Sequence, residues 1–418
     1  MDTHSDVISR ADPISLADVI ILGSGLVGAT LALALNAHGV TSIVIDPADP
    51  AMTLSPTFDG RASAVASASH RMLDMIGVGA ALQGYGCPIR HIRVADGLKP
   101  GKLDFKPDER DDPLGVMYEN KRLRRALFDA VTQAPHIDLR MKTQAVAQER
   151  GSTGVTVTLD SGDVIRAPLL VAAEGRRSPT REAAGITIAR WQYDHAAIVG
   201  AFHHERPHDN VAFEIFYPAG PFALLPLIDD EHGHRSAIVW TVAARDAAGM
   251  LKLGDRGFLA EAEKRMGGFL GTLSHASPRA SYPLGFHHAA TITAERLVLV
   301  GDAAHGIHPI AGQGLNLGFR DVAALAEVLV EGKRTGLDLG DAALLARYQR
   351  WRGLDTFMVA AATDSLNRLF GIPGSAASAV RRIGIAAVDH VPALKNRFMA
   401  EARGETGTLP KLLQGVPV

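Results

Sequence analysis

The glycine-rich turn between two apolar strands at residues 17–46 constrains the fold of this chain more than any other feature. An apolar run, ADVIIL (17–22), ends at GSGLVG (23–28). ATLALALNAHG (29–39) is typical of a helix that ends at Gly39, and TSIVID (41–46) begins a second strand. Strand, turn, helix and strand in this order form the right-handed crossover of a parallel sheet. The sequence therefore predicts a Rossmann-like α/β domain.

The three glycines of the turn have distinct roles in a dinucleotide site. Gly23 allows the tight turn, Gly25 lets the backbone approach a pyrophosphate, and Gly28 lets the helix pack on the strand. The N–H groups and the dipole at the start of the helix stabilise phosphates. Asp46 ends the second strand, where its carboxylate can accept both ribose hydroxyls of an adenosine; the alternative is a solvated Asp that caps a turn before Pro47. We predict an ADP-containing dinucleotide here, FAD or NAD.

A second glycine-rich stretch, GDAAHGIHPIAGQGLNLGFRD (301–321), follows the apolar run RLVLV (296–300). Gly301 lets the backbone turn after the strand, and Asp302 is then placed to accept hydrogen bonds from ribityl hydroxyls. The stretch leads into a helix whose first N–H groups can stabilise an anionic reduced isoalloxazine, so a flavin fits both features. The predicted N–H donors are Gly314, Leu315 and Asn316.

Two further charged clusters have alternative interpretations. His305 and His308 could belong to a metal site, but Pro309 disfavours a helix at His308 and no third ligand is evident, so we predict no metal. His305 is better explained as a histidine that closes the turn. The segment VAAEGRRSPTREAAGI (171–186) either faces a ligand or forms a solvated loop. Its charged residues are Glu174, Arg176, Arg177, Arg181 and Glu182.

The composition excludes several classes of protein. Lys and Arg total 43 against 45 Asp and Glu, and a net charge of -2 offers no electrostatic footprint for nucleic acid. Cys87 is the single cysteine, which excludes an internal disulfide and a cysteine metal cluster and fits a reducing compartment. Residues 1–16 have no apolar core and are not a signal peptide. Val19 to Ile45 carries no charged residue before Asp46, but its glycines suit a strand, a turn and a helix, so we predict no transmembrane helix.

The length of 418 residues allows two domains. Between residues 185 and 282, alternating apolar runs separated by Pro, Gly, Asp and His are typical of an antiparallel sheet. We therefore predict a Rossmann-like FAD-binding domain with an inserted antiparallel β-sheet substrate domain and C-terminal helices. The boundaries are 17–92, 117–186 and 283–336 for the FAD-binding domain, 93–116 and 187–282 for the substrate domain, and 337–418 for the C-terminal helical region.

With these elements in view, the chain resembles the class A flavoprotein aromatic hydroxylases, and within them the ubiquinone-biosynthesis hydroxylase family. Residues 301–321 match every fixed position of the family pattern GDAAHxxxPxxGxGxNxGxxD, including Gly312. Three other segments resemble those of the ubiquinone branch: FYPAGPFALLPL (216–227), TDSLNRLFG (363–371) and MAEARGETGTLPKLLQG (399–415).

Two more segments carry the resemblance into the cofactor site. DGRASAVA (59–66) is similar to a family stretch whose arginine lies near the flavin, which implies this position for Arg61. YENKRLRRAL (118–127) is similar to a helix that contributes a polar residue to FAD, which implies Asn120. The chain departs from the family at Glu174, where Asp is usual, and at His195, where many relatives have Gln; Glu174 keeps the charge on a longer side chain and stays a candidate ligand.

The resemblance also implies the chemistry. Reduced FAD activates O2 and delivers an electrophilic oxygen atom to an electron-rich phenol ring, so the protein must position the ring and exclude water. Pro309 would lie in a loop that lines the flavin. The base that activates the ring stays open, with Tyr193, His195 and Tyr217 as candidates. NAD(P)H bound without a nucleotide fold of its own, or a ferredoxin-type donor, would supply the electrons.

The predicted function is hydroxylation of the aromatic ring of a polyprenyl phenol in ubiquinone biosynthesis. The alternatives are a flavin hydroxylase of another phenol, a flavin halogenase, a flavin dehydrogenase or prenyl reductase, and a lipid-carrying protein on a degenerate flavin fold. The predicted location is the cytoplasm. Seven Lys and Arg against three Asp and Glu from Leu366 to Val418 suit peripheral docking on the inner membrane, near other ubiquinone-synthesis enzymes, and an ordinary solvated helix face explains them equally well.

Overall fold

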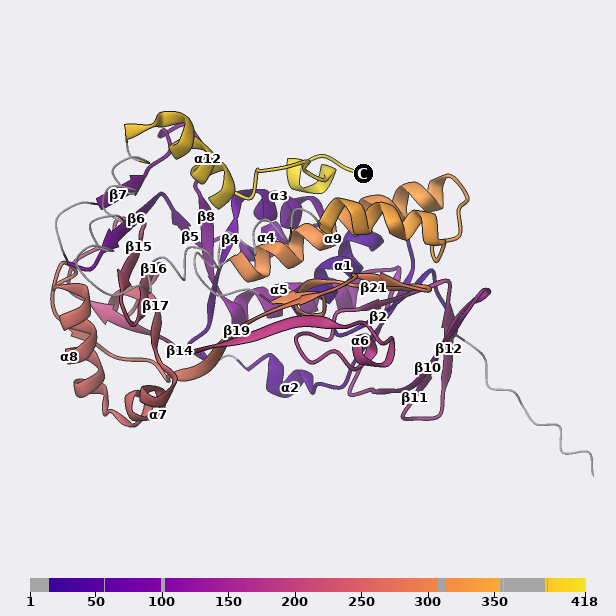
Figure 1. Cartoon of the computed structure of the whole chain (residues 1–418), viewed down its shortest axis with the longest axis horizontal. Helices are drawn as coiled ribbons and strands as arrows, with labels where there is room; N and C mark the ends of the chain where they lie inside the picture. The colour runs from indigo at the N-terminus through magenta and orange to yellow at the C-terminus, as the bar shows by residue number, and fades with distance from the viewer. Residues whose placement is uncertain are drawn as a thin grey trace, which may run out of the picture.

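The structure is a computed structural model that describes residues 15–55, 57–98, 102–306, 313–353, 356, 388 and 390–418. Two large sheets lie toward opposite ends of an elongated molecule, with a three-stranded sheet between them (Figure 1). The predicted fold class, a Rossmann-like domain combined with an antiparallel sheet, is confirmed. The N-terminal arm before residue 15 and the segment TDSLNRLFG (363–371) lie outside the described residues.

A six-stranded sheet forms the core of one end, in the order β20-β21-β13-β2-β3-β9. Five strands are parallel and β20 pairs antiparallel at the edge. The strands β2, β13 and β21 are uninterrupted apolar runs because both faces of the sheet are covered. The strands are β2 (Val19–Leu22), β3 (Ser42–Asp46), β9 (Ile137–Met141), β13 (Leu169–Ala172), β20 (Thr293–Ala294) and β21 (Leu297–Leu299).

Three helices and a second small sheet cover this core. Helix α1 (Leu26–Asn36) contacts both α5 (Asn120–Gln133) and α9 (Gln313–Arg334). A four-stranded sheet contributes Val155, Val157 and Ile165 to the same apolar core. Its order is β1 (Ser15–Leu16), β12 (Val164–Ala167), β11 (Gly154–Leu159) and β10 (Ala145–Gly151).

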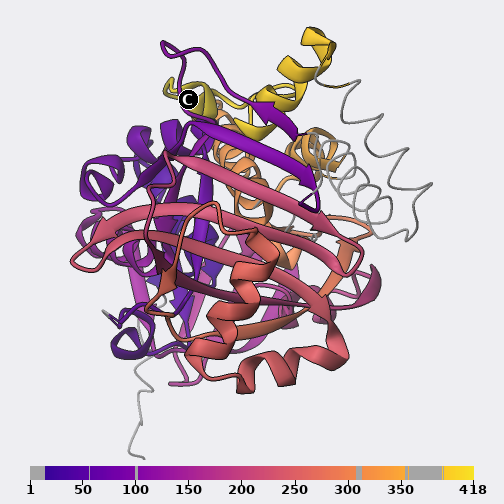
Figure 2. The same cartoon turned by 90° about the vertical axis from the view of Figure 1, so that its left-hand side faces the viewer.

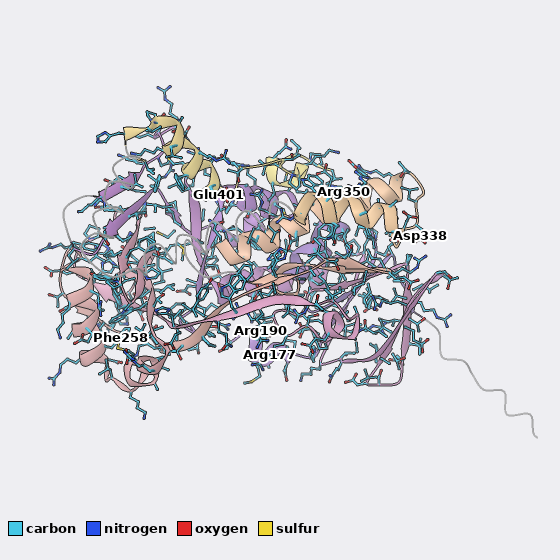
Figure 3. All side chains as sticks on the ribbon, viewed as in Figure 1. Arg177, Arg190, Phe258, Asp338, Arg350 and Glu401 are labelled. Carbon is cyan, nitrogen blue, oxygen red and sulfur yellow. The ribbon has the colours of Figure 1, made fainter. Side chains whose placement is uncertain are left out.

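The nine-stranded sheet at the other end is antiparallel except where β15 pairs with β6. Helices α7 (Ala244–Lys252) and α8 (Asp255–Met266) cross one of its faces (Figure 2), and Phe258 of α8 lies in this layer (Figure 3). The order is β22 (His305–Gly306), β19 (Ala280–Ala289), β14 (Ile188–His204), β17 (Gly233–Ala243), β16 (Gly220–Asp230), β15 (Val211–Tyr217), β6 (His91–Asp96) and β7 (Lys102–Phe105), with β18 (Leu273–Ser274) beside β14.

The opposite face of the nine-stranded sheet packs against the three-stranded sheet. Ala201, Leu227 and Ala237 share an apolar cluster with Ile89 and Met117 of this small sheet. Its order is β4 (Ala62–Ala66), β8 (Gly115–Glu119) and β5 (Cys87–Ile89). The small sheet therefore joins the two ends of the molecule.

The remaining helical elements surround this frame. Residues 342–353 are helical, and Tyr348 in this segment donates a hydrogen bond to the Leu299 carbonyl at 3.0 Å. Within the described ranges, no helix is both long and apolar enough to cross a bilayer. The other elements are α2 (Pro50–Thr53), α3 (Ser67–Met75), α4 (Gly79–Leu82), α6 (Pro179–Ala183), η1 (Gly301–Ala303), α12 (Pro392–Ala402) and η3 (Lys411–Gln414).

Asp321, in α9, is a fully buried carboxylate that joins three parts of the chain. Its Oδ2 accepts hydrogen bonds from the Gly301 N–H at 2.9 Å and from His305 Nε2 at 2.6 Å, and its Oδ1 accepts one from Arg352 Nε at 2.7 Å. Burial alone would raise the pKa of this carboxyl, but the charges of His305 and Arg352 outweigh burial and hold the pKa at about 2. Asp321 therefore stays ionised and fixes the 301–306 turn onto α9.

We expect Asp321→Asn to lower the free energy of unfolding by about 3 kcal/mol at neutral pH, because Arg352 loses its buried counter-charge and His305 loses its carboxylate partner. Since the folded pKa lies below the ordinary 3.8, this stabilisation is present above pH 3.8 and is lost as the pH falls toward 2. Urea denaturation at several pH values measures both effects. Asp138→Asn, at the exposed pair with Arg140, is the control and should change stability by less than about 1 kcal/mol. Equal effects of the two substitutions would contradict this account.

Candidate functional site

The carboxyl ends of four neighbouring parallel strands open at one edge of the six-stranded sheet. There β2 is followed by the glycine turn, β3 ends at Asp46, β13 is followed by Glu174, and β21 is followed by the 301–306 turn. Ligands of open parallel sheets bind at this edge. The fold therefore brings together predicted cofactor residues that lie far apart in the sequence.

The glycine turn has the shape that a bound phosphate requires. Gly23 has φ +101°, and a Cβ placed on it would lie 2.5 Å from the Ala173 carbonyl oxygen. A Cβ on Gly28 would lie 1.9 Å from the Gly23 carbonyl oxygen, whereas one on Gly25 would meet no atom within 4 Å. Gly25 is also the N-cap of α1 and makes no side-chain capping hydrogen bond. Two glycines thus serve close packing, and Gly25 leaves open space before a helix N-terminus, which fits a pyrophosphate.

Asp46 is held against this turn by hydrogen bonds. Its Oδ2 accepts from the Ser24 N–H at 2.7 Å and from Ser24 Oγ at 3.1 Å, and its Oδ1 accepts from the Ala48 N–H at 2.8 Å. A carboxylate has about four acceptor positions, so one is left, enough for a single ribose hydroxyl. The geometry leaves room for one of the two predicted hydrogen bonds to the ribose and includes the turn-capping bond that was the alternative.

The start of α9 lies beside the start of α1. A Cβ on Gly301 would lie 3.1 Å from Val27 Cγ2, and one on Gly318 would lie 2.7 Å from the same atom. Two helix N-termini therefore meet next to the exposed side chain of Asp302. Gly314 is open, since a Cβ there would meet nothing within 4 Å. This convergence stabilises negative charge, as a flavin and its phosphates require.

Three predicted residues meet at the three-stranded sheet. Asn316 is buried, and its side chain accepts from the Ala66 N–H at 2.9 Å and donates to the Ala64 carbonyl at 2.9 Å. The Arg61 carbonyl accepts from the Asn120 N–H at 3.0 Å. The Arg61 guanidinium pairs with Asp59 at 2.7 Å, and Asn120 Oδ1 accepts from Ser63 Oγ at 2.7 Å. Strand β4 is thus fixed to the first turns of α9.

Glu174 interacts with its own turn. Its carboxylate accepts from Ser178 Oγ at 2.5 Å and from Thr180 Oγ1 at 3.0 Å, so it orders the start of α6. Arg181 is buried, and its guanidinium donates to the Ala303 carbonyl at 3.0 Å. The segment 171–186 is therefore an ordered part of the site edge and not a loop that only faces solvent.

The three base candidates occupy different places. The Tyr217 hydroxyl donates to the Arg265 carbonyl on the α8 side of the nine-stranded sheet. His195 pairs with Ala243 beside an irregularity in β14. Tyr193 packs in a cluster with Trp191, Phe286 and Leu317, close to the start of α9. Tyr193 thus packs against a cluster that includes Leu317 of α9. Pro309, His308 and Gly312 lie outside the described residues.

His305 is hydrogen-bonded to Asp321, as described above. Among the residues that the structure describes, no group of three His, Cys, Asp or Glu side chains is arranged to hold a metal ion. His287 supports the same turn, since its Nε2 lies 2.8 Å from the Asp302 carbonyl oxygen, and burial lowers its pKa. The histidines around the turn therefore shape the backbone.

Several residues of this region were not singled out from the sequence. Arg352 bonds to Asp321, and Arg320 donates to the Thr406 carbonyl at 2.7 Å. Trp351 Nε1 donates to the Thr408 carbonyl at 2.8 Å. The C-terminal segment 399–415 therefore docks on α9. The resemblance of this segment to the family indicated that it has a structural role. The residues that it contacts could not be predicted from the sequence.

Taken together, the fold and the site define a flavoprotein with an FAD-binding domain, and comparisons with known proteins agree. The family model described as "FAD binding domain" matches residues 16–354. The ubiquinone hydroxylase UbiL of Rhodospirillum rubrum is 45% identical over 418 residues, which cover 99% of this chain and 95% of that protein. The 3-demethoxyubiquinol 3-hydroxylase of Escherichia coli is 33% identical, and the alignment covers 93% of this chain and 98% of that protein. The crystal structure of p-nitrophenol 4-monooxygenase PnpA from Pseudomonas putida has a TM-score of 0.78 at 18% identity. The superposition covers 95% of this chain and 100% of that one.

The chain belongs to the ubiquinone-biosynthesis hydroxylases, a family of FAD-dependent aromatic monooxygenases. The resemblance inferred from the sequence motifs is thereby confirmed.

We expect Gly25→Val to fold normally and to lose FAD, because the added side chain occupies space that is open in the protein and faces a helix N-terminus. Flavin content should fall about ten-fold or more, equivalent to about 1.4 kcal/mol. Absorption of the purified protein measures flavin, and thermal unfolding of the apoprotein measures stability. Gly28→Ala is the contrast, since its Cβ would strike the Gly23 carbonyl and should cost about 1–3 kcal/mol of stability. Wild-type flavin content in Gly25→Val would show that the turn does not hold a phosphate.

Asp302→Ala tests the second half of the site. The side chain is exposed, so the variant should fold, but loss of a charged acceptor should weaken flavin binding about ten-fold or more. Equilibrium dialysis against FAD gives the affinity. An unchanged affinity would contradict the assignment of Asp302.

Proposed function

We propose that this protein uses FAD to hydroxylate the aromatic ring of a polyprenyl phenol in ubiquinone biosynthesis. The observation that carries the proposal is 45% identity over the whole chain to the ubiquinone hydroxylase of Rhodospirillum rubrum. The geometry of the site supports it, since the edge that fits a dinucleotide adjoins the inner face of a large sheet.

We assign each part of FAD to residues that the sequence predicted. The glycine turn would hold the pyrophosphate of FAD, Asp46 the ribose, and Asp302 the ribityl chain. The N–H groups of Gly314, Leu315 and Asn316 would face the isoalloxazine, with Arg61 and Asn120 nearby. When bound and reduced, FAD supplies the activation of O2 and the transfer of one oxygen atom to the ring.

The protein's own contribution is to bind and orient the ring and to exclude water. The small and branched side chains Val199, Ala223 and Val239 occupy the inner face of the nine-stranded sheet and suit an aromatic ring with a prenyl chain. A dry site prevents loss of the activated oxygen as H2O2. The electron donor in this proposal is NAD(P)H or a ferredoxin-type protein.

Peripheral membrane contact is part of the proposal, because a polyprenyl substrate lies in a bilayer. Helix α12 exposes Leu394 and Phe398, and Lys395 and Arg397 lie on the same helix. An apolar surface with adjacent cations suits an anionic lipid surface. Cosedimentation with anionic vesicles tests this contact, and salt-independent failure to bind would remove it from the proposal.

Quinone profiling tests the function. Bacterial hosts that each lack one ubiquinone ring hydroxylase receive either this chain or Gly25→Val, and quinones are measured by mass spectrometry. We expect ubiquinone to return in at least one host with the wild-type chain only, and the rescued host identifies the ring position. Flavin-loaded protein without rescue in any host would contradict the proposal and favour another phenol or a dehydrogenase.

A further inference from the structure

A single carboxyl interrupts an apolar row that crosses the inner face of the nine-stranded sheet. Five successive cross-strand pairs form this row and place its side chains on one face. Phe213 and Ile215, which flank the carboxyl along β15, belong instead to the cluster under α7 and α8. The pairs are Val199–Val239, Val239–Ala223, Ala223–Glu214, Glu214–Val94 and Val94–Leu103.

One end of the row lies beside the predicted flavin site. A Cβ on Gly60 would lie 3.3 Å from Gly200 Cα and 3.7 Å from the Val199 carbonyl oxygen, so the loop before β4 touches the row there. Strand β4 follows, and Asn316 fixes it to the first turns of α9. The row thus runs from the flavin side of the protein to Glu214.

On the inner face, Glu214 lies between the part that packs on the three-stranded sheet and the part that packs on α12. Strand β16, on one side of β15, contacts β5 and β8 of the three-stranded sheet. Strand β7, beyond β6 on the other side, contacts α12, and the ring of Phe105 lies tilted against that of Phe398 with ring centroids 5.9 Å apart. Glu214 itself keeps some accessible surface, although the interior of the protein surrounds it. This combination fits a side chain on the wall of a binding site better than one in a close-packed core.

Among the described residues, none donates a hydrogen bond to the side-chain carboxyl of Glu214 or forms an ion pair with it. Other titratable groups on this face are Asp96 on β6, Arg235 on β17, and His195 and His203 on β14. Arg235 pairs with Glu119 of β8 and with Asp230, and His203 Nε2 lies 2.8 Å from Asp230. Arg235 and His203 therefore already have carboxylate partners, and the Glu214 carboxyl is left for a ligand.

We propose that Glu214 binds the phenolic hydroxyl of the substrate and accepts its proton. The proposal rests on the proposed function for the chemistry of the substrate. The O–H bond of the phenol breaks, its electron pair stays on the phenolic oxygen, and the proton passes to a carboxylate oxygen of Glu214. The ring becomes more electron-rich, which favours attack by an electrophilic oxygen, and the apolar row holds the ring in place.

The electrostatics of the site suit this role. Burial raises the pKa of Glu214 from 4.5 to about 7. A phenol has an ordinary pKa of about 10, so the raised value makes Glu214 a better proton acceptor than an exposed carboxylate. The folded protein disfavours ionisation of this carboxyl between pH 4.5 and 7. The free energy of unfolding therefore decreases as the pH rises through this window. Glu214→Gln should therefore be at least as stable as wild type at pH 8.

The kinetic test compares hydroxylation of 2-prenylphenol by flavin-loaded wild type, Glu214→Gln and Glu214→Asp over a range of pH. We expect Glu214→Gln to lower kcat about 100-fold at neutral pH with little change in KM, and to recover as the pH approaches the phenol's own pKa. Glu214→Asp should retain the rise of activity near pH 7 that Glu214→Gln lacks. Glu231→Gln, the same change at the exposed hairpin of the sheet, is the matched control and should behave as wild type. A loss that is equal at every pH would overturn the proposal, since a purely structural role gives no rescue.

A binding test separates this proposal from the proposed function. Wild type should bind 2-prenylphenol about ten-fold more tightly than its methyl ether, and Glu214→Leu should remove this preference. The change in flavin fluorescence on titration measures both affinities. If the preference depends on Glu214 but no phenol is hydroxylated, the proposed function fails and the assignment of Glu214 stands. If hydroxylation proceeds and neither the preference nor the pH profile depends on Glu214, the assignment fails and the function stands.

Discussion

The buried carboxylate of Asp321 is the interaction on which the site depends. It binds the backbone of Gly301, the ring of His305 and the guanidinium of Arg352, and thereby joins the turn after β21, the helix α9 and the C-terminal helical segment. A buried charge is tolerated only when it is paired and hydrogen-bonded, so each partner has little freedom to move. Gly301, which Asp321 binds, and Gly318 of α9 both lie close to Val27 in the first turn of α1. A rigid pair of helix N-termini is what an anionic dinucleotide requires.

The second constraint is the three-stranded sheet between the two ends of the molecule. Asn316 bonds to β4 from the flavin side, and the inner face of the nine-stranded sheet packs on β5 and β8 from the other. The position of that face relative to the cofactor edge is therefore determined by hydrogen bonds and apolar packing. This arrangement explains how residues of the inserted sheet, such as Glu214, can act on a ring whose oxidation depends on a cofactor held by the parallel sheet.

The sequence was sufficient for features whose interactions are local. The glycine turn packs against itself, as the close approach of Gly28 to Gly23 shows, and strands such as β11 and β13 carry their own apolar patterns. Features that depend on distant partners were not predictable. Arg352 is one of many arginines until the fold places it against Asp321, and Glu214 looks like the polar residue of an alternating strand until the register shows an apolar row. The pattern also predicted the sheet that holds Tyr217 but not the face, and its hydroxyl donates to the Arg265 carbonyl on the α8 side.

We propose that this site transfers one atom of O2 to a prenylated phenol. The most direct measurement supplies purified, flavin-loaded protein with a polyprenyl phenol, a reductant and O2 labelled with oxygen-18, and analyses the product by mass spectrometry. The account predicts one labelled oxygen in a new hydroxyl on the aromatic ring. Consumption of O2 that yields only H2O2, or a product with a reduced prenyl chain and no labelled oxygen, would contradict it.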